Sequence, residues 1–344
     1  MKEHRSKRNA DIEPSAFSPP SFLSRGMRSA YAVFVMGTVL FTVLYVAQLV
    51  RQNYLEPQFG PRHAVDLEEP EISSNGEHEL DCANRPVLRI AIAPVISPEK
   101  SIEMYRDLAY YLSARVERDA VILQRATYAE INELVRYRRC DIALVCTYPF
   151  VRGEQDFGME VLVVPQVAGA LGYSSLIVVP TSSEARSILD LRGRRFACAD
   201  MMSNSGWLFP ALWLKDQGED PESFFSEVLV AGSHDRSIQA VLSGYADGAA
   251  VHSLVYDKMV EDDPTILTRT KIIQESVSYG MPPFVVHPQM AADLKSRLRE
   301  ALLSMHEKPE GRIALSSIAI EKFVVANPAM YDSVRRAVDQ WESR

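Results

Sequence analysis

From residue 87 onward, hydrophobic and polar positions follow two alternating patterns. The apolar run Val87–Ala93 is typical of a buried strand, whereas apolar residues three or four positions apart over 102–116 predict a helix. Thr127 and Glu130 form a capping-box pair ahead of a second helix, which ends before a third strand at Asp141–Cys146. This order predicts a parallel sheet, and ligands of such sheets gather at the carboxyl ends of the strands.

The same alternation continues and indicates a second lobe. Ser174–Pro180 is predicted as the strand that crosses into it, and Phe284–Val286 as part of the return. The other predicted strands are Ala120–Gln124, Glu160–Gln166, Phe196–Ala199, Val228–Ala231, Ala249–His252 and Lys271–Glu275. Three helices are expected after the return, over Gln289–His306, Ile313–Phe323 and Met330–Trp341. We therefore expect an α/β fold with lobe 1 formed by 87–173 and 284–344, and lobe 2 by 174–283.

The first 86 residues have a different character. Ser29–Val50 is a stretch of 22 residues without a charge, and as a helix it would span about 33 Å, enough for a bilayer core. Basic residues in 1–28 predict a cytoplasmic leader, so everything from Arg51 on would lie outside, behind a single-pass membrane anchor. A cleaved signal peptide is the alternative. The proline-rich and acidic segment 51–86 is expected to be an extended linker.

Charge and motif content exclude several classes of function. The net charge of −8 argues against nucleic-acid binding, which needs a basic surface. The nucleophile-elbow, zinc-protease, P-loop and dinucleotide-binding motifs are missing from the sequence, so it predicts neither an enzyme nor a cofactor and offers no candidate catalytic residue. The four cysteines have no zinc-site spacing, so no metal site is predicted.

Two turns of the second lobe carry the candidate binding residues. Ser203, Asn204 and Ser205 follow a predicted strand and begin a helix, and His234 does the same after the next strand. A helix N-terminus offers unpaired backbone N–H groups and a positive dipole end, and small hydroxyl and amide side chains add donors for an oxyanion. Helix capping is the alternative role for Ser203 or Asn204, and a histidine satisfied by backbone groups is the alternative for His234.

Three further residues are expected at the same edge of the two sheets. Thr147 and Tyr148 end the third strand of the first lobe, and His252 ends a short strand of the second. Their hydroxyl, phenol and imidazole groups could close on a ligand from other sides. A structural spacer is the alternative role for His252.

The cysteines following the apolar segment would meet an oxidising compartment. Cys82 precedes the first strand and Cys140 precedes the third, so both are expected at the edge of the sheet opposite the ligand. A disulfide between these two is predicted, with Cys146 and Cys198 as buried thiols.

The sequence of the second lobe resembles that of a known family. The segments SGWLFP, FFSEV, GSHD and DGAAV occur in that order, preceded in the first lobe by YRDLAYYLSARV and DIALVCTYPFV. Over roughly Val87–Lys322 the chain is similar to the phosphate/phosphite/phosphonate-binding periplasmic solute-binding proteins of ABC transporters. That resemblance implies a two-lobed, type II-like periplasmic binding protein fold that closes on a small tetrahedral anion.

The resemblance also implies site residues. The Ser-Thr-Ser run that holds phosphonate oxygens in the family falls on Ser203, Asn204 and Ser205, and the histidine of GSHD is His234. Asn204 departs from the threonine of the family, and His252 stands where an aspartate usually pairs with a ligand amine. TYPF replaces the GP-x-x-Y turn, so Phe150 lacks the phenol. A simple oxyanion is therefore expected rather than an aminoalkylphosphonate.

The resulting hypothesis is a membrane-tethered solute-binding protein that delivers phosphate, phosphite or a phosphonate to an ABC permease, with a monomeric ectodomain. The alternative is a sensor: the same ectodomain would report its ligand to a membrane kinase or another signalling partner. A neighbouring permease gene would favour transport, and a neighbouring histidine-kinase gene would favour sensing.

Overall fold

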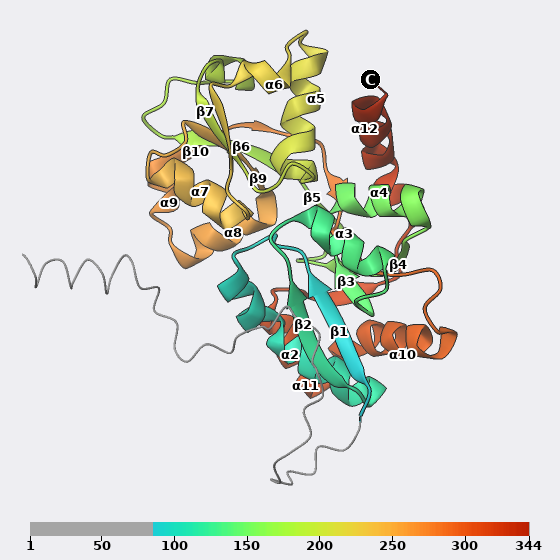
Figure 1. Cartoon of the computed structure of the whole chain (residues 1–344). Helices are drawn as coiled ribbons and strands as arrows, with labels where there is room; N and C mark the ends of the chain where they lie inside the picture. Colours follow the sequence, from blue (N-terminus) through green and yellow to red (C-terminus); the bar gives the residue numbers. More distant parts are fainter. Residues whose placement is uncertain (1–84, 344) are drawn as a thin grey trace, which may run out of the picture. The chain divides into compact units, whose positions relative to one another are not determined.

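The computed structural model describes residues 85–343, and these form two α/β lobes (Figure 1). The predicted leader at 1–28, the membrane helix at 29–50 and all but the last two residues of the linker at 51–86 lie outside the described residues. Within 85–343, no helix is both long and apolar enough to cross a bilayer.

A six-stranded sheet organises the first lobe, in the order β13-β4-β12-β3-β1-β2. β1 pairs in parallel with β2 and β3, as the sequence predicts, whereas β12 runs antiparallel between β3 and β4, and β13 is antiparallel to β4. The strands are β1 (Val87–Ile92), β2 (Asp119–Gln124), β3 (Ile142–Leu144), β4 (Glu160–Gln166), β12 (Phe284–Val286) and β13 (Lys322–Val324).

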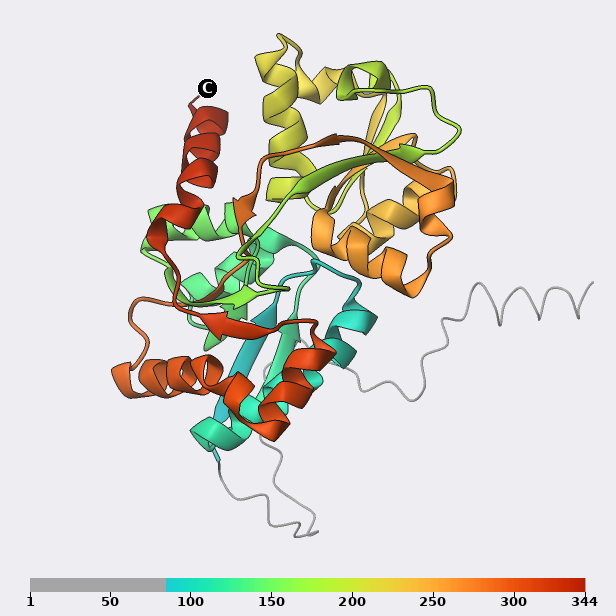
Figure 2. The ribbon, with the colours of Figure 1, turned by 180° about the vertical axis from the view of Figure 1, so that it is seen from behind.

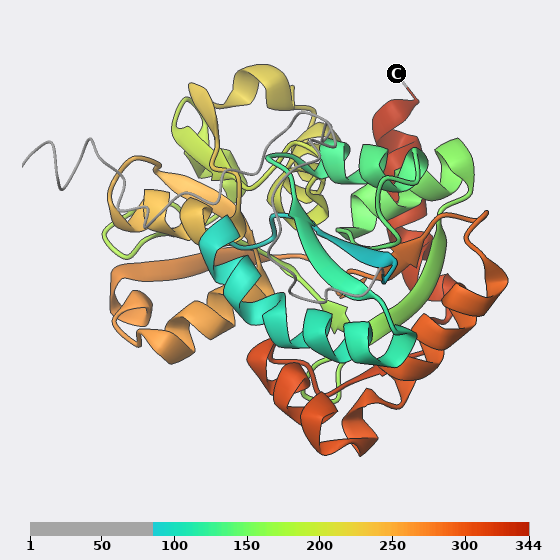
Figure 3. The same cartoon turned by 60° about the horizontal axis from the view of Figure 1, so that its bottom comes forward.

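Helices cover both faces of this sheet because its strands alternate apolar side chains between them. Ile90 and Ile92 pack with Leu112 and Leu298 on one face, which α2, α10 and α11 cover (Figure 3). Ala91 faces the opposite side, under α3, α4 and α12. The helices are α2 (Pro98–Val116), α3 (Tyr128–Arg136), α4 (Thr147–Phe157), α10 (Ala292–Leu303), α11 (Pro309–Ser317) and α12 (Asp332–Glu342), with short 3₁₀ turns η4 (Met305–Glu307) and η5 (Pro328–Tyr331).

The second lobe is built on a five-stranded sheet in the order β10-β6-β9-β7-β8. Its strands are β6 (Ser175–Pro180), β7 (Arg195–Cys198), β8 (Glu227–Val230), β9 (Gly248–His252) and β10 (Thr270–Glu275). Leu176 and Val251 face α7 (His234–Leu242) and α8 (Ser253–Asp262), whereas Ile177 and Phe196 face α5 (Phe209–Asp216). The remaining elements are η2 (Ile188–Leu191), the π-helical turn η3 (Asn204–Leu208), α6 (Pro221–Phe224) and α9 (Ile266–Arg269).

Two crossings join the lobes, and they lie side by side (Figure 2). β5 (Gly172–Tyr173) leads into the second lobe and β11 (Tyr279–Gly280) leads back, and the two pair antiparallel. The lobes are therefore connected by one short β-ribbon.

One prediction from the sequence is corrected by the structure. The helix expected over Ile313–Phe323 ends at Ser317, and Phe323 lies in β13, where it pairs with Pro165 and is buried in the sheet's core. Cys140 is a free, buried thiol, but its predicted disulfide partner Cys82 lies outside the described residues, so that disulfide stays a prediction. Burial raises the pKa of the Cys140 thiol to about 12, which disfavours its thiolate form. Cys146 and Cys198 are buried thiols, as predicted.

Candidate functional site

The turn after β7 is a π-helical one, a geometry that occurs frequently at functional sites. Ser203 begins it, and the Ser203 hydroxyl oxygen accepts a hydrogen bond of 2.9 Å from the Gly206 backbone N–H. A side chain on Gly206 would place its Cβ 2.9 Å from the Ser203 Oγ and 3.2 Å from the Ala199 nitrogen, so only glycine fits. The turn thus holds Ser203, Asn204 and Ser205 in a fixed, buried arrangement.

His234 begins α7 and points back toward this turn. Its Nδ1 accepts a hydrogen bond of 3.2 Å from the His252 backbone N–H, so in the neutral ring the proton must lie on Nε2. That Nε2 lies 3.4 Å from the Ser203 Oγ. The two helix starts predicted from the sequence therefore meet, and the imidazole presents a donor at their junction.

His252 ends β9 and packs beside His234. Its Nδ1 accepts from the Leu254 backbone N–H at 3.2 Å, which caps α8 and again leaves the proton on Nε2. The His252 ring stacks on Tyr173, with centroids 3.9 Å apart and planes 5° apart, and it meets His234 edge-on at 5.8 Å. His252 is therefore both a cap and one wall of the cluster.

Tyr173 links the two lobes through its hydroxyl. The hydroxyl lies 2.8 Å from the Thr147 Oγ1 at the start of α4, and it accepts a hydrogen bond of 3.1 Å from the Asn204 side-chain amide. Burial raises the pKa of Tyr173 well above its ordinary value, so the phenol stays protonated at neutral pH.

Two hydroxyls of the cluster lack a hydrogen bond of ordinary length and angle. The Ser205 Oγ and the Tyr128 hydroxyl are both buried without one, although the Ser203 side chain lies close enough to the Tyr128 hydroxyl to interact weakly with it. Burial raises the pKa of Tyr128 well above the ordinary range, which keeps the phenol a donor. Buried donors without acceptors are rare and costly, so these two groups mark a place suited to acceptor oxygens.

The structure brings six of the seven predicted residues together: Thr147, Ser203, Asn204, Ser205, His234 and His252. Tyr148 points elsewhere, and its hydroxyl donates to the Glu342 carboxylate of α12 at 3.3 Å. Whether any of these seven contacts a ligand stays a prediction. Sequence reasoning missed Tyr128 and Tyr173; the position of Tyr128 after β2 was a usable signal, because it lies at the same strand edge as Thr147.

Two buried carboxylates flank the cluster, and both join the lobes. Asp200 accepts a hydrogen bond of 3.0 Å from the Tyr128 backbone N–H at the start of α3, and one of 2.7 Å from the Met202 N–H. Asp235 accepts from the Ser97 backbone N–H ahead of α2 at 2.9 Å and from the Ser233 hydroxyl at 2.6 Å. Each acid of the second lobe thus satisfies a helix start of the first.

Both histidines of the cluster are expected to make stability depend on pH. Burial lowers the pKa of His234 to about 3, and the nearby Asp235 carboxylate partly opposes this shift. Burial also lowers the pKa of His252, and the neighbouring His234 lowers it further. The unfolded chain, with an ordinary pKa near 6.5, binds more protons than the folded one below that pH. This contribution to stability is therefore complete above about pH 6.5 and is lost as the pH falls toward the folded-state values.

We expect the melting temperature to fall between pH 7 and pH 5, and to fall less in the H234N/H252N variant. Thermal unfolding of both proteins across that range measures the difference. Val277, a non-titrating residue that is 71% exposed, supplies the control variant V277A, which should keep the wild-type slope. Equal slopes for wild type and the double variant would contradict this account.

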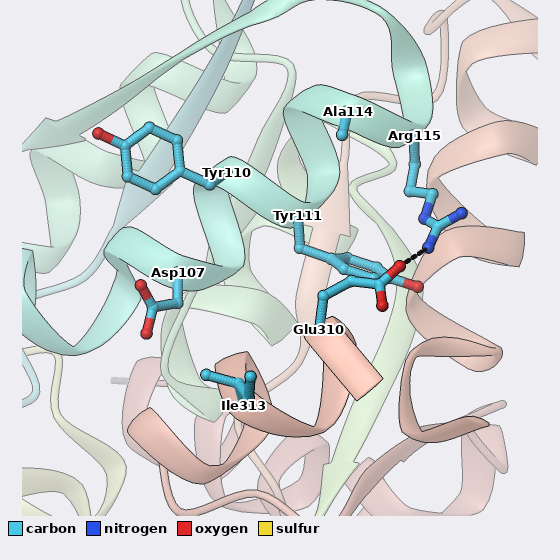
Figure 4. Close-up of a pocket in the computed structure, with 7 residues that line it drawn as sticks. All are labelled: Asp107, Tyr110, Tyr111, Ala114, Arg115, Glu310 and Ile313. Carbon is cyan, nitrogen blue, oxygen red and sulfur yellow. Dashed lines mark hydrogen bonds and ion pairs between the residues drawn. The ribbon is translucent and has the colours of Figure 1, made fainter. Parts of the chain in front are cut away.

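A separate hollow of about 480 Å³ lies on the surface between α2 and α11 (Figure 4). Asp107, Tyr110 and Ile313 border it, and an ion pair of 2.6 Å joins Arg115 to Glu310 at one side. Its polar groups do not converge on one point, unlike those around Ser203. Among residues 85–343, no group of three or more His, Cys, Asp or Glu side chains could hold a metal ion.

Comparison with known proteins gives one family match. Residues 90–331 match the family described as "ABC transporter, phosphonate, periplasmic substrate-binding protein". This match spans both sheets and every residue of the cluster described above.

Solved structures share the two-lobed fold. The binding-protein component of an ABC phosphonate transporter from Pseudomonas aeruginosa is 21% identical with a TM-score of 0.69, covering 74% of this chain and 86% of its own. PhnD1 from Prochlorococcus marinus, in complex with methylphosphonate, is 17% identical with a TM-score of 0.68, covering 75% of this chain and 99% of its own. A Xanthomonas citri protein bound to ATP is 21% identical with a TM-score of 0.63, covering 75% of this chain and 98% of its own. The shared architecture is the periplasmic binding protein fold.

Proposed function

The chain belongs to the phosphonate-binding family of periplasmic substrate-binding proteins of ABC transporters, and from that premise we propose that it captures a small tetrahedral oxyanion between its lobes and delivers it to a permease. Its family consists of solute-binding proteins and not of enzymes. The ligand would be phosphate, phosphite or a phosphonate, and closure of the lobes around it would be what the permease recognises.

The observation that carries this proposal is the pair of unpartnered donors. The Ser205 hydroxyl from the second lobe and the Tyr128 hydroxyl from the first are both buried and lack an acceptor at ordinary hydrogen-bond geometry, with only a weak contact from Ser203 to Tyr128. The protonated Nε2 of His234 lies at the same junction, 3.4 Å from the Ser203 hydroxyl. A tetrahedral oxyanion offers several acceptor oxygens that could satisfy donors from both lobes at once, which couples binding to closure.

Affinity would come from hydrogen bonds to a charged acceptor in a site closed to water. Each such bond contributes about 1.5–3 kcal/mol. No Lys or Arg is buried among residues 85–343. Neutral donors and the dipoles of the Ser203 and His234 turns would therefore supply most of the attraction for the anion.

The tether remains part of the proposal. The uncharged segment at 29–50 would hold the protein at the inner membrane, with the binding lobes in the periplasm. Such an anchor keeps the lobes close to a membrane permease and raises their effective concentration there. In intact cells the outer membrane should protect the lobes from added protease. When the outer membrane is opened, a free protein would be released into the medium, whereas an anchored protein would stay with the inner membrane.

Calorimetry of the full-length chain against phosphate, phosphite, methylphosphonate and 2-aminoethylphosphonate tests the binding proposal. The S203A/S205A variant should bind the preferred ligand at least tenfold more weakly, because two hydroxyl donors are lost. S243A is the matched control, since the Ser243 hydroxyl bonds to the Gln239 carbonyl at the far end of α7. Unchanged affinity in S203A/S205A would remove these serines from the site, and no heat with any oxyanion would reject the proposed function.

A further inference from the structure

Tyr173 occupies an unusual place for a residue of the connection between lobes. It lies on β5, one of the two crossing strands, and is only 3% exposed. Its ring packs flat on His252, and its hydroxyl contacts groups of both lobes, the Thr147 hydroxyl at 2.8 Å and the Asn204 amide at 3.1 Å. A crossing residue therefore reaches into the centre of the binding cluster.

The hydroxyl of Tyr173 engages donors of the kind that an oxyanion would use. The Asn204 amide nitrogen can only donate, so the phenol oxygen is the acceptor in that contact. The Ser205 and Tyr128 hydroxyls remain without an acceptor at ordinary hydrogen-bond geometry. The cluster is thus divided into donors already satisfied by Tyr173 and donors still available.

The ring of Tyr173 limits what else can enter. The Tyr173 and His252 rings, whose planes are 5° apart, form a buried aromatic wall. The ring of His234 lies edge-on to His252 beside this wall. A ligand group extending toward this wall would have to displace a stacked and hydrogen-bonded side chain. Compact ligands avoid that cost.

A cationic ligand group would also lack a partner. Asp200 and Asp235 are the only buried carboxylates among residues 85–343. Each already accepts two hydrogen bonds, and Lys100 lies 3.7 Å from the second oxygen of Asp235. A buried ammonium without a carboxylate is strongly disfavoured.

We infer that Tyr173 is a specificity-determining residue, whose ring excludes oxyanions that carry an extended or ammonium-bearing substituent. The substrate class is then the compact tetrahedral oxyanions, namely phosphate, phosphite and methylphosphonate. This inference rests on the proposed function, because it concerns the choice among oxyanions bound at the same site.

The test compares two ligands that differ only in the substituent. Full-length wild type should bind methylphosphonate at least tenfold more tightly than 2-aminoethylphosphonate in calorimetry. Y173A removes the wall and should reduce this ratio at least fivefold. Y173F keeps the ring and removes the hydroxyl, so affinities for both ligands should change by the same factor and leave the ratio as in wild type.

Y256A is the matched control for Y173A. Tyr256 is also 3% exposed and makes one hydroxyl contact of 2.9 Å, to Thr270, but it lies in the core of the second lobe away from the cluster. The ratio of the Y256A variant's affinities for methylphosphonate and 2-aminoethylphosphonate should equal that of wild type. If Y173A does not unfold cooperatively, Y173L vacates part of the same space and should shift the ratio in the same direction.

The outcomes separate this inference from the proposed function. If wild type binds methylphosphonate and 2-aminoethylphosphonate with similar affinities, Tyr173 does not set specificity. The same holds if the affinity ratio of Y173A and Y173L equals that of wild type. In both cases the proposed oxyanion binding would remain valid. A wild-type protein that binds none of the oxyanions would reject both.

Discussion

Replacing Asp200 and Asp235 together with alanine is expected to weaken oxyanion binding by at least a hundredfold. Neither carboxylate has to touch the ligand for this effect. Asp200 accepts from the Tyr128 backbone N–H and Asp235 from the Ser97 backbone N–H, so both stabilise contact between the lobes. Since the apparent affinity scales with the fraction of molecules in the binding-competent state, loss of closure lowers it directly.

The magnitude follows from the number of bonds lost. A hydrogen bond to a charged acceptor contributes about 1.5–3 kcal/mol, so losing one interlobe bond at each acid removes roughly 3–6 kcal/mol. At about 1.4 kcal/mol for each factor of ten, this corresponds to roughly a hundredfold to ten-thousandfold. The single variants D200A and D235A should each show a smaller loss.

Calorimetry gives the affinity, and small-angle scattering gives the radius of gyration, which should rise in the double variant. D247A is the control, because Asp247 pairs with Arg195 at 3.2 Å inside the second lobe. That variant should retain affinity and dimensions. If the double variant binds and scatters as wild type does, these carboxylates do not hold the lobes together.

Replacing Phe284 with alanine is expected to lower the free energy of unfolding by about 3–5 kcal/mol. Phe284 is fully buried on β12, which lies between β3 and β4, and its ring meets Phe323 edge-on with centroids 5.5 Å apart. Truncation would leave a cavity where the chain re-enters the first sheet, and this rigid core cannot fill it.

Urea unfolding, followed by tryptophan fluorescence, measures this loss. F284L should lose less, because leucine fills part of the space. V277A is the surface control: Val277 is 71% exposed, and the change should stay within about 0.5 kcal/mol. Equal stabilities for F284A and V277A would show that the core around β12 repacks freely.

The order of strands and the two turns around Ser203 and His234 were predictable because they depend on local patterns. Val87–Ile92 forms a strand almost as its apolar run predicts, and Thr127 caps α3 through the expected pair with Glu130. The short segment around Phe323 was not predictable. Its strand conformation depends on pairing with β4, which is more than 150 residues away in the chain and leaves no local signal.

The same limit applies to the site. Ser203, Asn204 and His234 could be inferred because each follows a strand and begins a helix. Tyr173 could not, because its importance arises from the packing of a crossing strand on His252 of the second lobe. Tyr148 shows the reverse case: its position beside Thr147 indicates the ligand edge, yet the C-terminal helix supplies Glu342 as its partner.

The paired strands β5 and β11 restrict how the lobes can move. Because the two crossings pair with each other, we expect them to bend together as one hinge when the lobes separate. A pair of labels, with one on each lobe, would follow that motion in solution.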